Sequence, residues 1–476
     1  MRYHSTRGDA PPLGFDDVLL TGLAPDGGLY LPESWPALDR ATLAGFAGRP
    51  YAEVAAEVMR PFMAGSAAAG EIDRLCAQAY GRFARAGTCP LVQIDEATWL
   101  LELFHGPTLA FKDVAMQILG DLFDHVLAAR GERITIVGAT SGDTGSAAIE
   151  ACRDRDNVDI VILHPKGRTS AVQRRQMTTV EAANVHNVAV DGTFDDCQAL
   201  VKAMFADEGF RDDVGLAAVN SINFARILAQ TVYYVTSAVA LGAPDRPVNF
   251  AVPTGNFGNV FAGHAARKMG VPIEMLTVAS NANDILTRFF DTGRMESQGV
   301  VATHAPSMDI QVSSNFERLL FELMDGDGRA TAREMQQFKQ TGAFALSQGQ
   351  LARARAGFDG FRLDDPGTLA EVARQYANTG MLIDPHSAIG LAAARERRSD
   401  PRVPTVALAT AHPAKFPDAV ERATGQRPPL PERLADLYDR PERYTPLPNE
   451  LAQVQAFVRN VSRRAGGDLA SSRTGS

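Results

Sequence analysis

Lys112 is the residue of this sequence with the clearest capacity for covalent chemistry. It lies in the segment HGPTLAFKD (105–113), behind the apolar residues 109–111 and at the start of a pattern that predicts a helix. Burial disfavours the ammonium form of a lysine, so that its free amine attacks a carbonyl more readily. A single lysine of this kind is more often a surface residue whose stem covers apolar neighbours. Its chemistry therefore depends on what accompanies it.

Two glycine-rich segments accompany it. VGATSGDTGSAA (137–148) follows an apolar run, and PTGNFGNVFAG (253–263) follows the strand-like 248–252 and leads into a helix through Lys268. A strand, a glycine-rich turn and a helix in succession direct backbone N–H groups and a helix N-terminus at an anion. Either segment alone could equally be a tight turn. Neither matches the Rossmann fingerprint or the Walker A pattern, which argues against dinucleotides and nucleoside triphosphates.

Two anion-binding loops and a reactive lysine together indicate pyridoxal phosphate, with one loop for the cofactor phosphate and one for a substrate carboxylate. Six motifs in this order resemble those of threonine synthase: HGPTLAFKD, ATSGDTG, NSINFAR, PTGNFGN, DPHSA and TAHPAKF. YHSTRG (3–8) and LAPDGGLYLPE (23–33) resemble the additional N-terminal domain of its bacterial and fungal form. The resemblance extends from about residue 2 to residue 425.

The resemblance implies roles in cofactor binding. Lys112 would form the Schiff base and then move protons, because a free amine beside the substrate carbons is a natural base. Thr410 would bind the pyridine nitrogen, although without the resemblance it would be an ordinary hydroxyl at a strand end. The loop for the cofactor phosphate would consist of Gly255, Asn256, Phe257, Gly258 and Asn259. The two asparagines could also be helix caps, and capping uses the same geometry as anion binding.

The resemblance also implies roles in substrate binding. The loop for the substrate carboxylate would consist of Ser141, Gly142, Asp143 and Thr144. Residues at or near the substrate phosphate would be Asn220, Ser221 and Arg226. Arginine suits phosphate because its donors form a planar, permanently charged fork. A helix arginine is more often solvated, but the apolar residues 227–229 favour a cleft wall. Asp143 stands where several relatives of the broader fold carry Asn, and its carboxylate would repel a second anion.

Alternating strand-like and helical patterns predict an α/β fold with doubly wound parallel sheets. Apolar runs fall at 134–137, 158–163, 185–190, 216–220, 248–252, 274–279 and 404–409. Three segments that follow such strands, 138–145, 253–259 and 410–416, should point toward one cleft. Residues 281–400 are predicted to be mainly helical with polar loops.

The length of 476 residues suggests two or three domains. We expect an N-terminal domain (1–85), a catalytic region (86–430) in two subdomains of the fold-type II class with the active site between them, C-terminal helices (431–462) and a disordered tail (463–476). Four scattered cysteines form no metal or disulfide pattern. A net charge of −9 without a basic stripe argues against nucleic acid as a partner. No signal pattern and no membrane-length apolar run is found, which predicts a cytoplasmic protein.

The implied reaction converts O-phospho-L-homoserine and water to L-threonine and phosphate, the last step of threonine biosynthesis, as a carbon–oxygen lyase acting as a monomer or homodimer. One alternative is another enzyme of the same fold, such as a serine/threonine dehydratase or a sulfhydrylase. The DGGLY and NSINFAR segments argue against it. A second alternative is a non-catalytic binder of phosphorylated amines. The presence of both Lys112 and Thr410 argues against that. No histidine pair has metal-ligand spacing, so no metal is expected.

Overall fold

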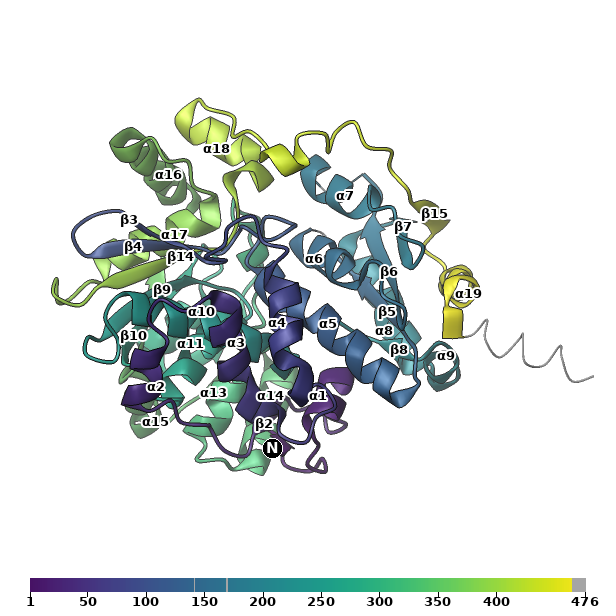
Figure 1. Ribbon diagram of the computed structural model, residues 1–476, viewed down its shortest axis with the longest axis horizontal. Coiled ribbons are helices and arrows are strands. Elements are labelled where there is room, and N and C mark those ends of the chain that lie inside the picture. Colours follow the sequence, from purple (N-terminus) through teal and green to yellow (C-terminus); the bar gives the residue numbers. More distant parts are fainter. Residues whose placement is uncertain (141, 168–169, 465–476) are drawn as a thin grey trace, which may run out of the picture. The chain divides into compact units, whose positions relative to one another are not determined.

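The structure is a computed structural model, and it describes residues 1–140, 142–167 and 170–464. Two compact units make up the chain. The first comprises Met1–Val18, Gly22–Ala115 and Ser221–Pro429. The second comprises Leu19–Thr21, Met116–Asn220 and the chain from Leu430 onward. Figure 1 shows the helices and strands coloured along the sequence.

A six-stranded sheet with the order β13-β10-β9-β14-β4-β3 forms the centre of the first unit. All neighbouring strands are parallel except β3 and β4. The strands are β3 (Leu91–Gln93), β4 (Thr98–Glu102), β9 (Val248–Pro253), β10 (Ile273–Ser280), β13 (Phe358–Arg362) and β14 (Thr405–Ala409). Every residue of β9 and β14 is buried, as expected for strands of a parallel sheet covered on both faces.

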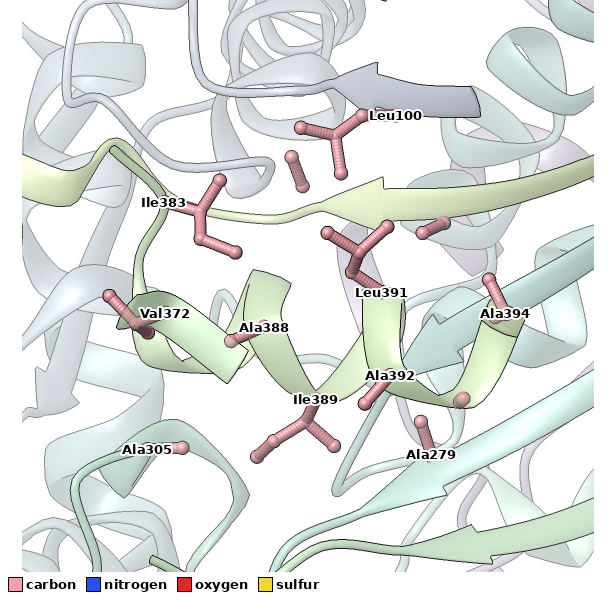
Figure 2. Close-up of a cluster of buried hydrophobic side chains, with 14 of the residues drawn as sticks. Leu100, Ala279, Ala305, Val372, Ile383, Ala388, Ile389, Leu391, Ala392 and Ala394 are labelled. Atoms are coloured by element: carbon pink, nitrogen blue, oxygen red, sulfur yellow. The ribbon is translucent and has the colours of Figure 1, made fainter. Parts of the chain in front are cut away.

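Helices cover both faces of this sheet. Ala251 of β9 belongs to an apolar cluster with Ile389 and Leu391 of α17 (Pro385–Glu396), and Figure 2 shows α17 lying along the strands. The preceding residue, Phe250, faces the other way because side chains alternate along a strand. Its ring packs 4.7 Å from that of Tyr234 on α10 (Phe224–Ala240). The doubly wound arrangement expected from the sequence is therefore present.

The remaining helices of the first unit follow from the same amphipathic patterns. They are α2 (Arg40–Gly45), α3 (Tyr51–Met59), α4 (Ile72–Tyr80), α11 (Gly258–Lys268), α12 (Ile285–Thr292), α13 (Phe316–Leu323), α14 (Gly328–Thr341), α15 (Gln348–Arg355), α16 (Asp365–Thr379) and α18 (Pro417–Thr424). Two helices contain residues of both units, α1 (Phe15–Thr21) and α5 (Lys112–Arg130).

The second unit contains a five-stranded sheet with the order β15-β7-β6-β5-β8, in which all neighbours are parallel. The strands are β5 (Ile134–Ala139), β6 (Val158–Pro165), β7 (Val185–Asp191), β8 (Leu216–Ala217) and β15 (Thr445–Pro448). The helices are α6 (Asp143–Cys152), α7 (Ala171–Thr178), α8 (Phe194–Ala206), α9 (Glu208–Val214) and α19 (Leu451–Val461). Val161 and Leu163 of β6 pack in one core with residues of α8, α9 and α19.

The N-terminal segment, residues 1–18 and 22–32, belongs to the first unit and packs on its helices. Its strands β1 (Tyr3–Ser5) and β2 (Tyr30–Pro32) pair antiparallel. The hydroxyl of Tyr3 donates to the carbonyl of Phe62 at 2.7 Å, and the Tyr3 ring lies 5.2 Å from that of Phe224 on α10. This segment is thereby fixed to the helix whose first turn carries Arg226.

Several elements differ from the sequence expectation. The range 281–400 also contains two short paired strands, β11 (Arg294–Glu296) and β12 (Ala343–Ala345), and it contributes β13 to the main sheet. β13 was hidden by its short length and its central Gly360, at which a Cβ would lie 2.9 Å from Cα of Thr287. β8 ends at Ala217 rather than continuing to residue 220.

The range 431–462, for which helices were expected, contains strand β15 as well as α19. The sequence of β15 does not have a typical strand pattern, because it contains Pro446 and Pro448 and proline cannot donate to a sheet. β15 tolerates them because it lies at the edge of its sheet and has only β7 as a neighbour. Of the tail expected to be disordered, residues 465–476 lie outside the described residues, and Arg463 pairs with Asp159 at 2.6 Å.

Candidate active site

The turn that precedes Lys112 is held by buried polar groups. It follows β4, and Lys112 is the first residue of α5. The fully buried carboxylate of Asp113 accepts from the backbone N–H and the hydroxyl of Thr108, each at 2.7 Å. The ammonium group of Lys415, which is also buried, donates to the carbonyl of Thr108 at 2.7 Å. Lys112 itself is partly exposed. The turn that leads into Lys112 is therefore fixed by buried hydrogen bonds.

Main-chain bonds join the Lys112 turn to the segment that follows β14. The N–H of Phe111 donates to the carbonyl of Thr410 at 2.8 Å, and the N–H of His412 donates to the carbonyl of Leu109 at 3.0 Å. Ala110 and Ala411 form the antiparallel bridge between these bonds. Leu109 has a φ of +63°, which gives the turn its direction. The structure thus holds the main chain just before Lys112 beside the segment that contains Thr410.

The segment Gly255–Asn259 follows β9, a strand adjacent to β14, and leads into α11. Phe257, just before α11, has a φ of +60°. A Cβ at Gly255 would lie 3.1 Å from Ile310, and one at Gly258 would lie 3.2 Å from Nδ2 of Asn315. The first turn of a helix leaves N–H groups without intrahelical acceptors, and these groups bind anions.

Asn259 contributes a side-chain donor at the N-terminus of α11. Its Oδ1 accepts from the hydroxyls of Tyr233 and Tyr234 on α10, the second at 2.9 Å. This arrangement fixes which end of the amide carries the donor. Nδ2 is buried and has no hydrogen-bond partner among the described residues. A buried donor without an acceptor is costly, and a bound anion would satisfy it.

Arg226 is also a buried side chain with hydrogen-bond donors that lack acceptors in the described residues, and it carries a full charge. It lies in the first turn of α10 and is 3% exposed. Within the described part of the chain, its Nε and Nη1 find no hydrogen-bond partner. Burial lowers the pKa of Arg226 to about 10, so that it stays protonated at neutral pH. A buried guanidinium with unused donors fits a phosphate or carboxylate group.

Ser221 and Ile222 precede α10, and side chains hold both of their carbonyls. Nδ2 of Asn315 donates to the carbonyl of Ser221 at 3.1 Å, and Nη2 of Arg318 donates to that of Ile222 at 2.6 Å. Ser221 and Arg226 therefore belong to the first unit together with Lys112 and Thr410, whereas Asn220 is the last residue of its segment in the second unit.

The loop expected to bind a substrate carboxylate belongs to the second unit. The hydroxyl oxygen of Thr140 accepts from the N–H groups of Gly142 and Gly145, each at 3.1 Å. Asp143 begins α6, and its carboxylate accepts from Nε2 of Gln173 at 2.9 Å. Thr144 follows within that helix, and Ser141 lies outside the described residues. Asp143 therefore orients the loop through Gln173.

Three strand-following segments were expected to point toward one cleft. Two of them, 253–259 and 410–416, follow the adjacent parallel strands β9 and β14 of the first unit. Their shared edge is confirmed. The third, 138–145, follows β5 in the sheet of the second unit.

The histidines within the motifs have structural partners. Nδ1 of His386 lies 2.7 Å from Asp384, and its Nε2 accepts from the N–H of Ser307 at 3.2 Å. Nε2 of His105 lies 2.7 Å from Glu102, and Nδ1 of His412 accepts from the N–H of Ala414 at 3.1 Å. No group of three or more potential metal ligands occurs in residues 1–140, 142–167 and 170–464.

The sequence did not point to several residues that shape the site. They are Asp113, Gln173, Tyr233, Tyr234, Ser313, Asn315, Arg318 and Lys415. Asp113 and Lys415 stand inside recognisable motifs and could have been suspected as buried partners. Asn315 and Arg318 stand outside every motif, and only the fold shows what they contact.

Comparison with known families matches the chain in three parts. Residues 2–80 match the family model "Threonine synthase N terminus", residues 86–358 match "Pyridoxal-phosphate dependent enzyme", and residues 387–458 match "Threonine synthase, C-terminal". Among the helices of the described residues, none is long and apolar enough to cross a membrane.

Individual relatives agree with these models. Threonine synthase of Pseudomonas aeruginosa is 56% identical over 465 residues, covering 98% of this chain and 99% of its own. The enzyme of Saccharomyces cerevisiae is 40% identical, covering 91% and 93%. The crystal structure of PLP-bound threonine synthase from Brucella melitensis has a TM-score of 0.96 and 55% identity, covering 97% of this chain and 100% of that one. The yeast structure has a TM-score of 0.92.

Proposed function

The chain belongs to the threonine synthase family of pyridoxal-phosphate enzymes, and we propose that its substrate is O-phospho-L-homoserine, which it converts with water to L-threonine and phosphate. The observation that carries this choice of substrate is Arg226. A buried guanidinium with unused donors in the first unit suits a substrate that brings a phosphate of its own. A dehydratase substrate such as serine or threonine has no such group.

The residues of the first unit fit the cofactor. The amine of Lys112 would hold its aldehyde carbon, and the hydroxyl of Thr410 would bind its pyridine nitrogen. The N–H groups of Gly255–Asn259 and Nδ2 of Asn259 would bind its phosphate, because this donor is buried and lacks a partner in the described residues. When bound, the cofactor draws electrons from the substrate carbons and makes their protons acidic.

The side chains then divide the work of positioning and proton transfer. Nζ of Lys112 takes the proton from the α carbon and then one from the β carbon, because a free amine within reach of these carbons is a suitable base. The electron pair freed at the β carbon expels the phosphate from the γ carbon, and the α carbon takes its proton back at the end. The same amine can deliver a proton to the γ carbon after the phosphate has left. Arg226, with Ser221 and Asn220, holds the substrate phosphate and neutralises the charge that builds up as the C–O bond breaks. Water adds at the β carbon.

The resemblance assigns the loop of the second unit to the substrate carboxylate. The N–H groups of Asp143 and Thr144 at the start of α6 suit the substrate carboxylate, and Ser141 and Gly142 are assigned to the same loop. The carboxylate of Asp143 is engaged by Gln173 and serves the shape of this loop. The reaction class that follows is that of a carbon–oxygen lyase, in the last step of threonine biosynthesis. We place the enzyme in the cytoplasm, as a monomer or homodimer.

Turnover of O-phospho-L-homoserine tests the proposal directly. We expect threonine and inorganic phosphate to appear in equal amounts, with no keto acid. Release of a keto acid and ammonia from serine or threonine, without action on phosphohomoserine, would show that the enzyme is a dehydratase.

A further inference from the structure

The first turn of α13 lies between the N-terminal segment and the cofactor-phosphate loop. Asn315, which precedes the helix, and Arg318 are both 0% exposed. Nε of Arg318 donates to the carbonyl of Tyr30 in β2 at 3.1 Å, and its Nη2 donates to the carbonyl of Ile222 at 2.6 Å. Its Nη1 donates to Oδ1 of Asn315. One guanidinium thus joins three segments that lie far apart in the sequence.

Asn315 passes this connection to the cofactor loop. Because its Oδ1 accepts from Arg318, the other end of the amide, Nδ2, must be the donor. Nδ2 donates to the carbonyls of Asn256 and Ser221, each at 3.1 Å. The backbone N–H of Asn315 also donates to the carbonyl of Asn256 at 3.1 Å. Nearby, the hydroxyl of Ser313 donates to the carbonyl of Gly255 at 2.7 Å.

These bonds fix the direction of the amide donors. A peptide unit is planar, and its C=O and N–H point in opposite directions. A carbonyl held at Asn256 therefore sets the direction of the N–H of Phe257, and a carbonyl held at Gly255 sets that of Asn256. In the same way, the bonds to Ser221 and Ile222 fix the N–H groups of the two residues that follow them. The loop 255–259 is thus held through its carbonyl groups, on the side opposite to its N–H donors.

The neighbouring Glu317 binds the N-terminal segment. Its Oε1 accepts from the hydroxyl of Thr6 at 2.7 Å, and Arg7 donates to both carboxylate oxygens at 3.0 Å. Glu317 is 3% exposed and Thr6 is fully buried. The N-terminal segment thus holds the first turn of α13 through Glu317 and Arg318, and this turn holds the loop through Asn315.

The chemistry of Arg318 argues against a purely structural role. The oxygens of Tyr30, Asn315 and Ile222 that accept from it are amide oxygens, so that none of them neutralises its charge. Burial lowers the pKa of Arg318 to about 9. Apolar side chains usually fill a buried position at lower cost than an ion does. A cation that bonds the backbone on which phosphates are expected to lie adds a favourable field for them.

We propose that Asn315 and Arg318 are positioning residues that orient the peptide N–H groups for the cofactor and substrate phosphates, and that the N-terminal segment acts on the active site through them. This inference rests on the assignment of Gly255–Asn259 to the cofactor phosphate. It gives the N-terminal segment a role in cofactor affinity in addition to its role in folding.

Asn315→Asp tests the first part in the full-length protein. It keeps the shape and the acceptor for Arg318 but replaces Nδ2 by an oxygen that repels two carbonyls. We expect the dissociation constant for pyridoxal phosphate to rise about tenfold or more, since each hydrogen-bonded partner is left unsatisfied. The phosphorus NMR signal of the bound cofactor should shift as well, because its donors are misdirected.

Asn184→Asp is the matched control. Nδ2 of Asn184 also donates to carbonyls, those of Cys152 at 2.7 Å, Val158 at 2.8 Å and Arg155 at 3.4 Å, and the residue is 3% exposed. It lies in the second unit, outside the proposed network. We expect a similar fall in thermal stability and an unchanged dissociation constant. Equal stability losses with an unchanged cofactor constant and phosphorus signal in Asn315→Asp would overturn the proposal.

Arg318→Lys decides the matter if Asn315→Asp does not accumulate as folded protein. Lysine keeps the charge, but its single nitrogen cannot serve three oxygens that three separate nitrogens of arginine serve. We expect the dissociation constant to rise here too, and an unchanged constant with a lowered melting temperature would refute the inference. If residues 255–259 did not bind the cofactor phosphate, the wild-type protein would bind the cofactor through other residues. That result is distinct from a failure of Asn315 and Arg318 to position the loop.

The role of the N-terminal segment is tested by Glu317→Gln alone and combined with Asn315→Asp. The single change weakens the contact with Arg7 and should raise the cofactor dissociation constant by a smaller factor than Asn315→Asp. If the effect passes through Asn315, it should disappear in the double variant. Independent, multiplicative effects of the two changes would show that the N-terminal segment does not act through Asn315.

Discussion

The backbone N–H of Phe111 donates to the carbonyl of Thr410 over 2.8 Å. This bond and its return partner, from His412 to Leu109, connect main-chain atoms only. Main-chain bonds alone therefore hold the backbone of Lys112 near that of Thr410, and the side chains of these two residues take no part in them. Substitution of Lys112 or Thr410 should consequently test chemistry, while the folded arrangement is retained.

Lys112 should carry the cofactor. The purified protein should be yellow, and borohydride should remove the absorbance band and leave a stable adduct on Lys112. Peptide mapping by mass spectrometry locates the adduct. Lys415, which is buried and donates to Thr108, is the internal comparison, and an adduct there would refute the assignment of Lys112.

Arg226→Ala should lower kcat/KM for phosphohomoserine and leave the cofactor absorbance intact. A hydrogen bond to a charged group contributes about 1.5–3 kcal/mol, which corresponds to roughly ten- to a hundredfold in rate. Arg355→Ala is a suitable control, because Arg355 donates to the carbonyls of Phe290 and Asp291 and should affect stability alone. Equal kcat/KM values for wild type and Arg226→Ala would remove Arg226 from the site.

Thr410→Val keeps the side-chain shape and removes the hydroxyl. The variant should fold and show the absorbance of the bound cofactor, and its turnover should be slow because proton removal depends on the electron-withdrawing ring. The exchange of the substrate α proton with solvent deuterium measures this step directly. Normal exchange would mean that Thr410 is only a residue at the end of β14.

The stability of the fold should decline in mildly acidic solution because of three histidines that are buried or half-buried. Burial lowers the pKa values of His4, His164 and His186 below 6.5. The unfolded chain takes up these protons as the pH falls below about 6.5, whereas the folded chain does so only at lower pH. The stabilising contribution is therefore complete above pH 6.5 and is lost as the pH falls through the lowered native values.

A comparison of thermal unfolding midpoints at about pH 8 and about pH 5.5 measures this effect. His164→Gln removes one of the three groups and should reduce the difference between the two midpoints. The same difference in wild type and variant would show that His164 titrates alike in the folded and unfolded states.

Much of the first unit could be predicted from local sequence. The strand patterns located β9 and β14, and the segments 253–259 and 410–416 that follow them were predicted to converge, because ligands bind beyond the carboxyl ends of parallel strands. Asn315 and Arg318 could not be found in this way. Their importance depends on residues far from them in sequence, since Arg318 contacts Tyr30 and Ile222 and Asn315 contacts Ser221.

Asp143 shows a second limit. Its acidic side chain in an anion-binding loop was difficult to interpret from sequence, since a carboxylate repels a bound carboxylate. The structure supplies Gln173, which lies 30 residues later and donates to Asp143. The sequence shows that a charged residue is present, but only the fold shows which hydrogen-bond donor contacts it.

Strand β15 has a consequence for how the molecule avoids association with its own copies. Its residues alternate as Thr445, Pro446, Leu447 and Pro448, and successive residues of a strand direct their backbone groups to opposite sides. Proline has no N–H, so that the strand's only donors, those of Thr445 and Leu447, point to the same side, where β7 lies. The outer rim of this sheet then offers acceptors without donors. A strand of another molecule that paired with this edge could donate its N–H groups, but its carbonyl groups would have no donor. This mismatch protects the protein from edge-to-edge aggregation.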